Sequence, residues 1–222
     1  IFKPQFSYSL SSKYDLTDHS SIRAVIGTAN RYPDFTELYT YQVDSNHNIL
    51  GDENLTPENG YSTSIQWNNR SRFGNFRMEN NVTTLYLDVD DKIDLVNFGG
   101  ANYKFMNIDK YKTWGVSTDH RFTWNRLSLG LGASLFGESQ TLSSQTYSAD
   151  QKTEDEYRYH FQGNASLNYQ IPSWATTFSI YYKYTGKSSQ FLLDYENSTQ
   201  ENTYFTLAKR DDFNMLDASI RK

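Results

Sequence analysis

The sequence lacks several features that would assign it to a common class of protein. It has no cysteine, so neither disulfides nor thiolate metal sites are available. It has no long apolar run, and a mean hydropathy of -0.74 excludes a membrane-spanning helix. Basic residues number 21 against 26 acidic ones, and a net charge of -5 with no basic stripe argues against a nucleic-acid partner.

Aromatic residues are the abundant feature of this hydrophilic chain. Its 222 residues include 18 Tyr and 14 Phe, and aromatic residues make up 16% of the total. Disordered chains are poor in aromatic residues, whereas tyrosine suits a strand with one face in water. The composition therefore favours an all-β protein.

Strict alternation of apolar and polar residues recurs along the chain. In residues 157–170, "YRYHFQGNASLNYQ", the odd positions are aromatic, aliphatic or small and the even positions are polar. Similar patterns predict about nine strands of roughly 10 to 14 residues, longer than usual strands. In residues 75–90 the apolar positions shift from Phe76 and Met78 to Leu85, Leu87 and Val89, which predicts a bulge or a position at the rim of the sheet. The only expected helix is one short turn within "DFTELYTYQ".

The connections between these strands alternate in length. Short connections are expected at 14–20, 69–75, 124–127 and 171–174, and long ones at 30–59, 91–109, 137–156 and 187–211. In an up-and-down meander, alternate connections lie at opposite ends of the sheet. Short turns at one end and long loops at the other are typical of an antiparallel transmembrane β-barrel, with polar side chains toward the lumen and apolar ones toward lipid. Two rings of aromatic residues at the membrane interfaces would agree with such a barrel. Next to the short turns lie Trp67, Trp124 and Trp174, and nearer the long loops lie Tyr86, Tyr157 and Tyr184.

Two alternatives share part of this pattern. A soluble β-sandwich or lectin-like carbohydrate-binding module would pack its aromatic face inward, but its strands are usually shorter. A passive porin-like barrel would have an open lumen with many charged residues, whereas the inward positions here are mostly Ser, Thr, Asn and Gln.

The most specific stretch is "IRAVIGTANRYPDFTELYTYQVDSNHNILGDENLTPENG". It resembles the barrel of TonB-dependent outer-membrane receptors, in which R-A-x-x-G-x-x-x-R-x-P-x-x-x-E-L-Y precedes G-N-x-x-L-x-P-E. The matching residues are Arg23, Ala24, Gly27, Arg31, Pro33, Glu37, Leu38 and Tyr39, then Gly51, Glu53, Asn54, Leu55, Pro57 and Glu58. The stretches "NVTTLYLDVDDKIDLV", "NIDKYKTWGVSTD" and "FNMLDASIRK" follow in the family's order.

The resemblance implies active uptake rather than catalysis. The family barrel has about 22 strands, so the chain is expected to be an incomplete segment, with the plug domain and the final strands outside it. Implied partners are those missing parts, the TonB-ExbB-ExbD system, the lipid of a Gram-negative outer membrane and, additionally, a surface lipoprotein. The implied ligand is a scarce metal chelate: a ferric siderophore, haem or cobalamin.

Within this resemblance, the long loops hold the candidate ligand-binding residues. Aromatic side chains with polar tips suit a large, flat, amphipathic chelate, and a histidine could approach its metal. These candidates are Tyr32, Tyr39, Tyr41, His47, Tyr103 and Tyr147. A structural role at the base of the first long loop is expected for Arg31, Pro33, Glu37, Pro57 and Glu58. For each single loop residue, a solvated position is the simpler alternative.

One group of carboxylates is a weak candidate for Ca²⁺. "DVDDKID" places Asp88, Asp90, Asp91 and Asp94 at a strand–loop junction, and oxygen ligands suit this ion. The stretch lacks the glycine and distal Glu of a calcium loop, so a solvated acidic rim is the alternative. No intrinsic cofactor is expected.

Overall fold

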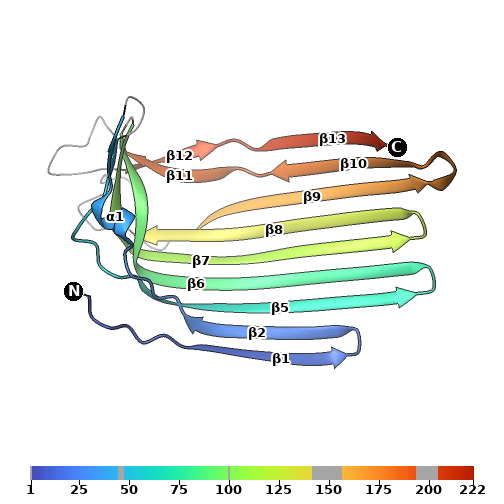
Figure 1. The fold of residues 1–222 in the computed structure, drawn as a ribbon, viewed down its shortest axis with the longest axis horizontal. Coiled ribbons are helices and arrows are strands. Elements are labelled where there is room, and N and C mark those ends of the chain that lie inside the picture. Colours follow the sequence, from blue (N-terminus) through green and yellow to red (C-terminus); the bar gives the residue numbers. More distant parts are fainter. Residues whose placement is uncertain (1, 45–47, 100, 142–156, 194–204) are drawn as a thin grey trace.

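The computed structural model describes residues 2–44, 48–99, 101–141, 157–193 and 205–222, and its main feature is one long antiparallel meander (Figure 1). Nine strands follow one another in chain order across this sheet. They are β1 (Ser9–Thr17), β2 (Ser20–Thr28), β5 (Asn59–Phe73), β6 (Phe76–Gly99), β7 (Asn102–Trp124), β8 (Leu127–Thr141), β9 (Arg158–Ile171), β10 (Thr176–Thr185) and β13 (Phe213–Arg221). The predicted up-and-down segment of a barrel is confirmed, and the sheet is not closed.

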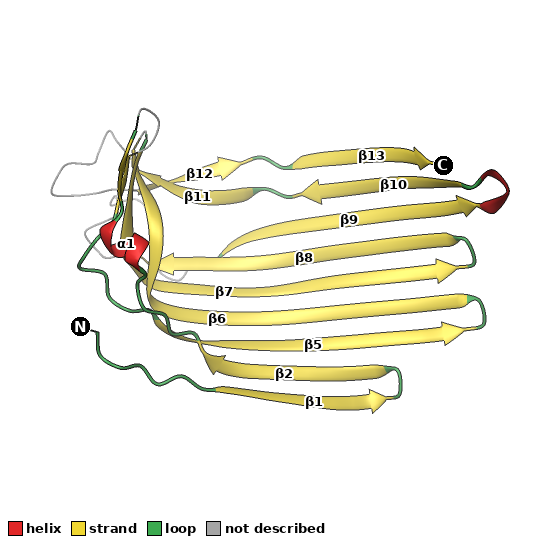
Figure 2. Ribbon diagram, viewed as in Figure 1, coloured by secondary structure: helices red, strands yellow, loops and turns green. Residues whose placement is uncertain are grey.

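The remaining elements are short and lie toward one end of the sheet, apart from one turn of 3-10 helix. They are α1 (Phe35–Tyr39), β3 (Tyr41–Val43), β4 (Asn48–Leu50), η1 (Pro172–Trp174), β11 (Ser188–Leu193) and β12 (Phe205–Arg210). β4 pairs with β3 and, in parallel, with β7, and β11 pairs with β12 in a separate sheet. Figure 2 shows how little of the chain is helical. Within the described residues, no helix is long and apolar enough to cross a membrane.

The connections are sorted by length between the two ends of the sheet. The tight turns β1–β2, β5–β6, β7–β8 and β9–β10 lie together at the right in Figure 1, and α1, β3 and the β6–β7 hairpin lie at the opposite end. Three of these turns use left-handed backbone, at Gly74 (φ 59), Asn125 (φ 52) and Ala175 (φ 50). The four predicted short turns therefore share one end of the sheet, and we call this end the short-turn end and the opposite one the long-loop end.

The prediction of a long loop over residues 91–109 is wrong. β6 and β7 continue through this stretch and reach 24 and 23 residues, paired up to Gly99 and Asn102. β4 adds to the far end of β7, so backbone pairing supports the extension from a second side. The β6–β7 hairpin therefore projects beyond the sheet as a folded arm at the long-loop end.

Strand register separates the two faces of the sheet as predicted. One row across β5 to β9 reads Ile65, Thr84, Val116, Leu135 and Phe161, and the next reads Gln66, Thr83, Ser117, Ser134 and Gln162. The apolar face remains exposed, for example at Ile65, Leu135 and Phe161. An apolar surface of this extent needs a non-aqueous environment, which lipid supplies around a transmembrane barrel.

The bulge predicted within residues 75–90 is absent. Each residue from Phe76 to Asp90 has a partner on β5 in unbroken register. Leu85 and Val89 therefore point to the otherwise polar face. Leu85 lies opposite Gly115, and a Cβ at Gly115 would overlap the Phe136 ring, so Phe136 occupies that space. An apolar patch on the polar face, not a change of register, explains the shifted pattern.

The buried apolar core lies at the long-loop end. Among the described residues it comprises Leu55, Val89, Ile93 and Ile108, from the β2–β5 loop and the β6–β7 arm. A single-layer sheet has no core of its own. The loop and arm supply one where they meet.

Candidate functional site

The base of the β2–β5 loop is built around Arg31. Its backbone pairs with that of Glu58, which closes the loop. Its guanidinium lies 2.7 Å from Glu37 Oε2 and 2.6 Å from Glu58 Oε1. Both carboxylates are largely buried, and their hydrogen bonds, first that of Glu37 and then that of Glu58, raise the pKa of Arg31 above its usual value. The structure thus brings together three of the residues that the sequence predicts for a loop base.

Helix α1 starts at this ion pair. Asp34 Oδ1 accepts a hydrogen bond from the Glu37 backbone N–H at 2.8 Å, and Glu37 Oε2 accepts one from the Asp34 backbone N–H at 2.8 Å. This reciprocal arrangement is a capping box, here with Asp at its first position. Pro33, which is buried, precedes the cap. Glu37 therefore fixes the start of α1 and its attachment to Arg31 with one carboxylate.

Glu58 and Asn107 join the β2–β5 loop to the β6–β7 arm. Glu58 Oε1 accepts from the buried backbone N–H of Ile93 at 2.8 Å. Asn107 Oδ1 accepts from the Thr56 N–H at 2.8 Å, and Asn107 Nδ2 donates to the carbonyl of Thr56 at 3.0 Å and that of Asp91 at 2.6 Å. The sequence reasoning missed Asn107, because its partners are backbone groups that lie 51 and 16 residues away along the chain.

An ion pair adds to this junction. Lys104 Nζ on β7 lies 2.7 Å from Asp52 Oδ2 in the loop. Burial opposes the charged form of Asp52, but its hydrogen bonds with Lys104 and Asn54 win, so the pKa of this carboxyl is lowered. The loop and the arm therefore form one connected unit. It is held by the pairing of β4 with β7, by hydrogen bonds of the Asn107 side-chain amide, and by the carboxylates of Glu58 and Asp52.

Exposed aromatic side chains lie on this unit. The rings of Phe35 and Tyr39 on α1 are 5.0 Å apart, with exposed fractions of 78% and 52%, and Tyr41 is 79% exposed. The sequence reasoning missed Phe35, although its spacing of four residues from Tyr39 on a helix would have paired them. Phe35, Tyr39 and Tyr41 are available to a ligand that approaches the long-loop end.

The other predicted ligand-binding residues are placed differently. The Tyr32 hydroxyl accepts from the Gln5 N–H and donates to the Lys3 carbonyl, both at 2.8 Å, so it holds the N-terminal segment. Tyr103 lies on β7 opposite Ile49 of β4 and is partly buried. His47 and Tyr147 lie outside the described residues.

The carboxylates proposed for Ca²⁺ lie mostly beside lysines. Asp88 and Asp90 are 3.9 and 3.8 Å from Lys110 Nζ, and Asp94 is 3.1 Å from Lys92 Nζ. Asp91 has left-handed backbone (φ 56). Across the part of the chain that the structure describes, no three His, Asp or Glu residues gather as a metal-binding group. Calcium binding here stays a prediction.

Comparison with known proteins agrees with this architecture. A family model described as "TonB dependent receptor-like, beta-barrel" matches residues 3–222. The chain belongs to this family. The TonB-dependent receptor barrel is a transporter and receptor fold rather than an enzyme family. No curated protein sequence matches the chain.

Solved structures with the same fold are distant in sequence. The FrpB iron transporter from Neisseria meningitidis (F3-3 variant) has 17% identity over 96% of this chain and 31% of its own, with a TM-score of 0.63. Its F5-1 variant has 16% identity over 96% of this chain and 32% of its own, with a TM-score of 0.61. The siderophore receptor PirA from Acinetobacter baumannii has 12% identity over 96% of this chain and 34% of its own, with a TM-score of 0.58. The chain thus spans about a third of these proteins.

Proposed function

We propose that this chain is part of the wall and outer loops of a Gram-negative outer-membrane transporter that imports a scarce metal chelate with energy relayed through TonB. The observation that carries the proposal is the asymmetry of the TonB-dependent receptor barrel seen here. Its tight turns lie at one end, and a braced loop unit with exposed aromatic rings lies at the other. The full-length protein would add the remaining strands, a plug and the contact with the TonB-ExbB-ExbD system.

A ferric chelate is the ligand class that we favour over haem and cobalamin. The proteins that share the fold are described as an iron transporter and a siderophore receptor. The exposed rings of Phe35, Tyr39 and Tyr41 offer flat apolar surfaces, and the two tyrosines add hydroxyl groups. Such rings suit an amphipathic chelate with aromatic or extended planar groups. Tyr32, His47, Tyr103 and Tyr147 remain secondary candidates for ligand contact, and a surface lipoprotein remains a proposed partner.

Binding to the refolded full-length protein tests the ligand class. We expect a ferric siderophore to bind at least tenfold more tightly than haem or cobalamin, by intrinsic fluorescence quenching. Replacing Tyr39 and Tyr41 by Ala should weaken that binding by roughly 10- to 100-fold, since buried aromatic contacts commonly contribute about 1 to 3 kcal/mol. Tyr14→Ala is the matched control, because Tyr14 lies on the apolar face of β1 near the short-turn end and its exposed fraction of 69% lies between those of Tyr39 and Tyr41.

The transport step has a separate test. Uptake of the labelled chelate by cells that carry the full-length protein should stop when TonB is absent. Uptake that continues without TonB would support a passive barrel and contradict active transport. Equal weak binding of all three chelates would contradict the metal-chelate assignment.

A further inference from the structure

A row of polar side chains crosses the otherwise apolar face near the short-turn end. Asn69 on β5, Asn80 on β6 and His120 on β7 lie opposite one another in the register. Asn69 is four residues from Ile65, and His120 is four residues from Val116, so the row shares the face that lipid covers around a barrel. We call Asn69, Asn80 and His120 the amide–imidazole row.

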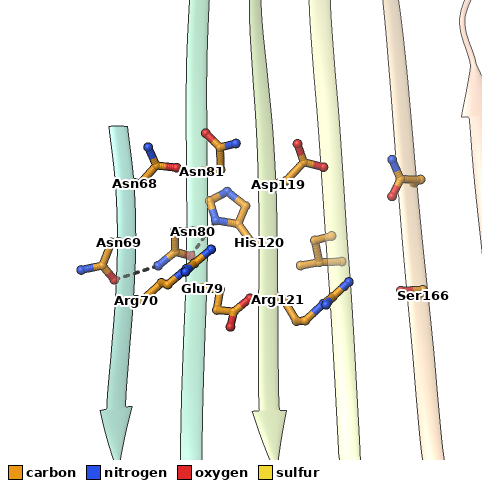
Figure 3. A pocket seen from close by; sticks show the side chains of 13 residues that line it. Asn68, Asn69, Arg70, Glu79, Asn80, Asn81, Asp119, His120, Arg121 and Ser166 are labelled. Atoms are coloured by element: carbon orange, nitrogen blue, oxygen red, sulfur yellow. Dashed lines mark hydrogen bonds between the residues drawn. The ribbon is translucent and has the colours of Figure 1, made fainter. Parts of the chain in front are cut away.

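Hydrogen bonds join these three side chains in one direction (Figure 3). His120 Nδ1 lies 2.8 Å from Asn80 Oδ1, and because an amide oxygen can only accept, Nδ1 is the donor. Asn80 Nδ2 donates to Asn69 Oδ1 at 3.3 Å. Asn69 Nδ2 donates to the His19 carbonyl in the β1–β2 turn at 3.4 Å. The row is therefore ordered and tied to the turn.

This chain of bonds leaves defined polar groups free within the described residues. Each of the two amide nitrogens makes one hydrogen bond there and keeps a second N–H. Since His120 donates through Nδ1, its Nε2 keeps a lone pair in the neutral ring and can accept. All three side chains are partly exposed. The row thus presents two donors, on β5 and β6, beside an acceptor on β7.

These polar groups are out of place on a surface that hydrocarbon covers. A polar group that leaves water without a partner costs free energy. On β8 and β9 the same row continues as Leu131 and Ala165. The next row towards the turns contains Met78 and Phe122 on β6 and β7. The polar groups are therefore confined to three strands of an apolar face, which indicates a ligand with matching polar groups.

The row lies near the level where headgroups meet acyl chains. His120 is four residues from Trp124, the last residue of β7, which places it roughly 10 Å from the short turns if the strand is tilted as in a barrel. Aromatic side chains flank the row, because the rings of His120 and Phe122 stack with centroids 6.3 Å apart and Trp67 lies in the row on the other side. Aromatic residues gather at the interfaces of a membrane.

Donors beside an acceptor match a zwitterionic headgroup. A phosphate diester accepts from the amide N–H groups, and a primary ammonium donates to the imidazole nitrogen. Neighbouring strands are about 4.8 Å apart, a distance that the short carbon linker of ethanolamine spans. In the described parts of β5 to β9, no Lys or Arg lies in this row or in the two rows beside it on the same face. An anionic lipid would therefore find no counter-charge here.

We propose that the amide–imidazole row binds the headgroup of a phosphatidylethanolamine in the leaflet at the short-turn end. The amides of Asn69 and Asn80 bind the phosphate, and His120 Nε2 accepts from the ammonium. The acyl chains lie along the apolar face beside Leu131. The inference rests on the membrane location in the proposed function and not on the uptake of a metal chelate.

A neighbouring membrane protein is the less suitable occupant. Polar side chains also join membrane proteins to one another. A stable protein interface commonly buries about 800 Å² on each partner, however, and the polar groups here form a single row. The rows on both sides are mostly apolar or aromatic.

Lipid titration tests the headgroup. In native mass spectrometry of the full-length protein in a mild detergent, the first phosphatidylethanolamine should bind more tightly than phosphatidylcholine or phosphatidylglycerol with the same acyl chains. We expect a preference of roughly 3- to 10-fold, the factor for one additional hydrogen bond. Choline has no N–H, so phosphatidylcholine separates hydrogen bonding from charge. Equal binding of the three lipids would overturn the proposal.

Two variants separate the donors from the acceptor. His120→Leu should bind phosphatidylethanolamine and phosphatidylcholine equally, because the ammonium loses its acceptor. Asn80→Leu should weaken the binding of both lipids by roughly 3- to 10-fold, because the phosphate loses a donor. Thr84→Leu, a polar side chain replaced by Leu on the same face, is the matched control and should keep the wild-type preference. A wild-type preference in His120→Leu would contradict the assigned acceptor.

Cross-linking in membranes identifies the kind of molecule that covers the row. The 222 residues contain no cysteine, so Leu131→Cys, beside His120, can carry a benzophenone maleimide in the full-length protein. After irradiation, mass spectrometry should find phosphatidylethanolamine adducts above the share of this lipid in the membrane. Leu135→Cys, further along the same face of β8, is the control and should give adducts in proportion to the lipid composition. A peptide adduct at Leu131→Cys, from a second copy or another protein, would refute lipid as the occupant.

The outcomes separate this inference from the transport proposal. If the protein prefers phosphatidylethanolamine but binds no metal chelate, the lipid site stands and the ligand assignment fails. If chelate uptake depends on TonB but the three lipids bind equally, transport stands and this inference fails.

Discussion

At the scale of single residues, the Glu58 side chain joins the loop base to the β6–β7 arm. It accepts from Arg31 and from the Ile93 N–H through one oxygen, and its backbone pairs with Arg31. Its side chain is only 12% exposed, so the removal of its oxygens leaves a buried N–H without a partner. An orphaned buried donor costs about 1 to 3 kcal/mol.

Glu58→Ala should therefore loosen the β6–β7 arm where it meets the loop. We expect amide hydrogen exchange at Ile93 in the full-length protein to accelerate by roughly 5- to 150-fold, the factor that corresponds to that energy. Asp15→Ala is the control, because Asp15 forms an exposed pair with Lys13 at the short-turn end. Exposed pairs contribute about 0 to 1 kcal/mol, so exchange at Ile93 should not change. Unaltered exchange in Glu58→Ala would show that the loop base is not held by this carboxylate.

At the scale of elements, the β2–β5 loop and the β6–β7 arm behave as one unit whose stability depends on pH. The pKa of Asp52 is lower in the folded protein than its ordinary value of 3.8. The ion pair between Asp52 and Lys104 therefore stabilises the unit at pH values above 3.8. The stabilisation is lost as pH falls through the lowered pKa, because protonation then removes the charge.

The difference between the wild-type protein and Asp52→Asn measures this contribution. At pH 7 we expect the variant to open the loop more readily, by up to about 1 kcal/mol, since Lys104 is 43% exposed and solvent screens the pair. As pH falls through the lowered pKa of Asp52, the difference in amide hydrogen exchange between the two proteins across residues 48–58 should disappear. A difference that stays constant as pH falls from 7 to well below 3.8 would mean that the Asp52 carboxylate charge contributes nothing.

How far the sequence predicts these elements depends on the range of the interactions. Alternation in residues 157–170 predicts β9 and its two faces correctly, because successive side chains of one strand point to opposite faces and no distant residue is needed to place them. The motif around Arg31 and Glu37 predicts a loop base, since the partners are six residues apart. The length of the β6–β7 arm was missed, because it depends on pairing with β4 and on contacts of Asn107 with Thr56. The bulge predicted within residues 75–90 was wrong because it also depends on a distant residue. Phe136, on β8, fills the space at Gly115 opposite Leu85, so Leu85 has an apolar neighbour on the otherwise polar face.

At the scale of the whole molecule, the described part of the sheet leaves both edge strands unpaired and its apolar face exposed. Among the residues that the structure describes, β1 and β13 each have a single neighbour in the sheet, so each presents an unpaired edge. The apolar face is exposed along the sheet, with Leu10 at 68%, Ile180 at 49% and Ile220 at 71%. Unpaired edges and large apolar patches both promote association between chains. In a complete barrel, the neighbouring strands and the lipid cover them.

The 222-residue chain on its own should therefore not remain monomeric in water. Diluted from denaturant into detergent-free buffer, we expect it to elute as aggregate in size-exclusion chromatography and to show no cooperative melting by circular dichroism, because water cannot satisfy the apolar face and the edges pair with other copies. The full-length protein, refolded in detergent under the same conditions, is the control and should elute as a single species that melts cooperatively. Detergent alone should not rescue the short chain, since it covers the apolar face but not the edges of β1 and β13. A monomeric, cooperatively melting short chain in buffer would show that these strands form a self-sufficient fold, and the requirement for the rest of the barrel would then be wrong.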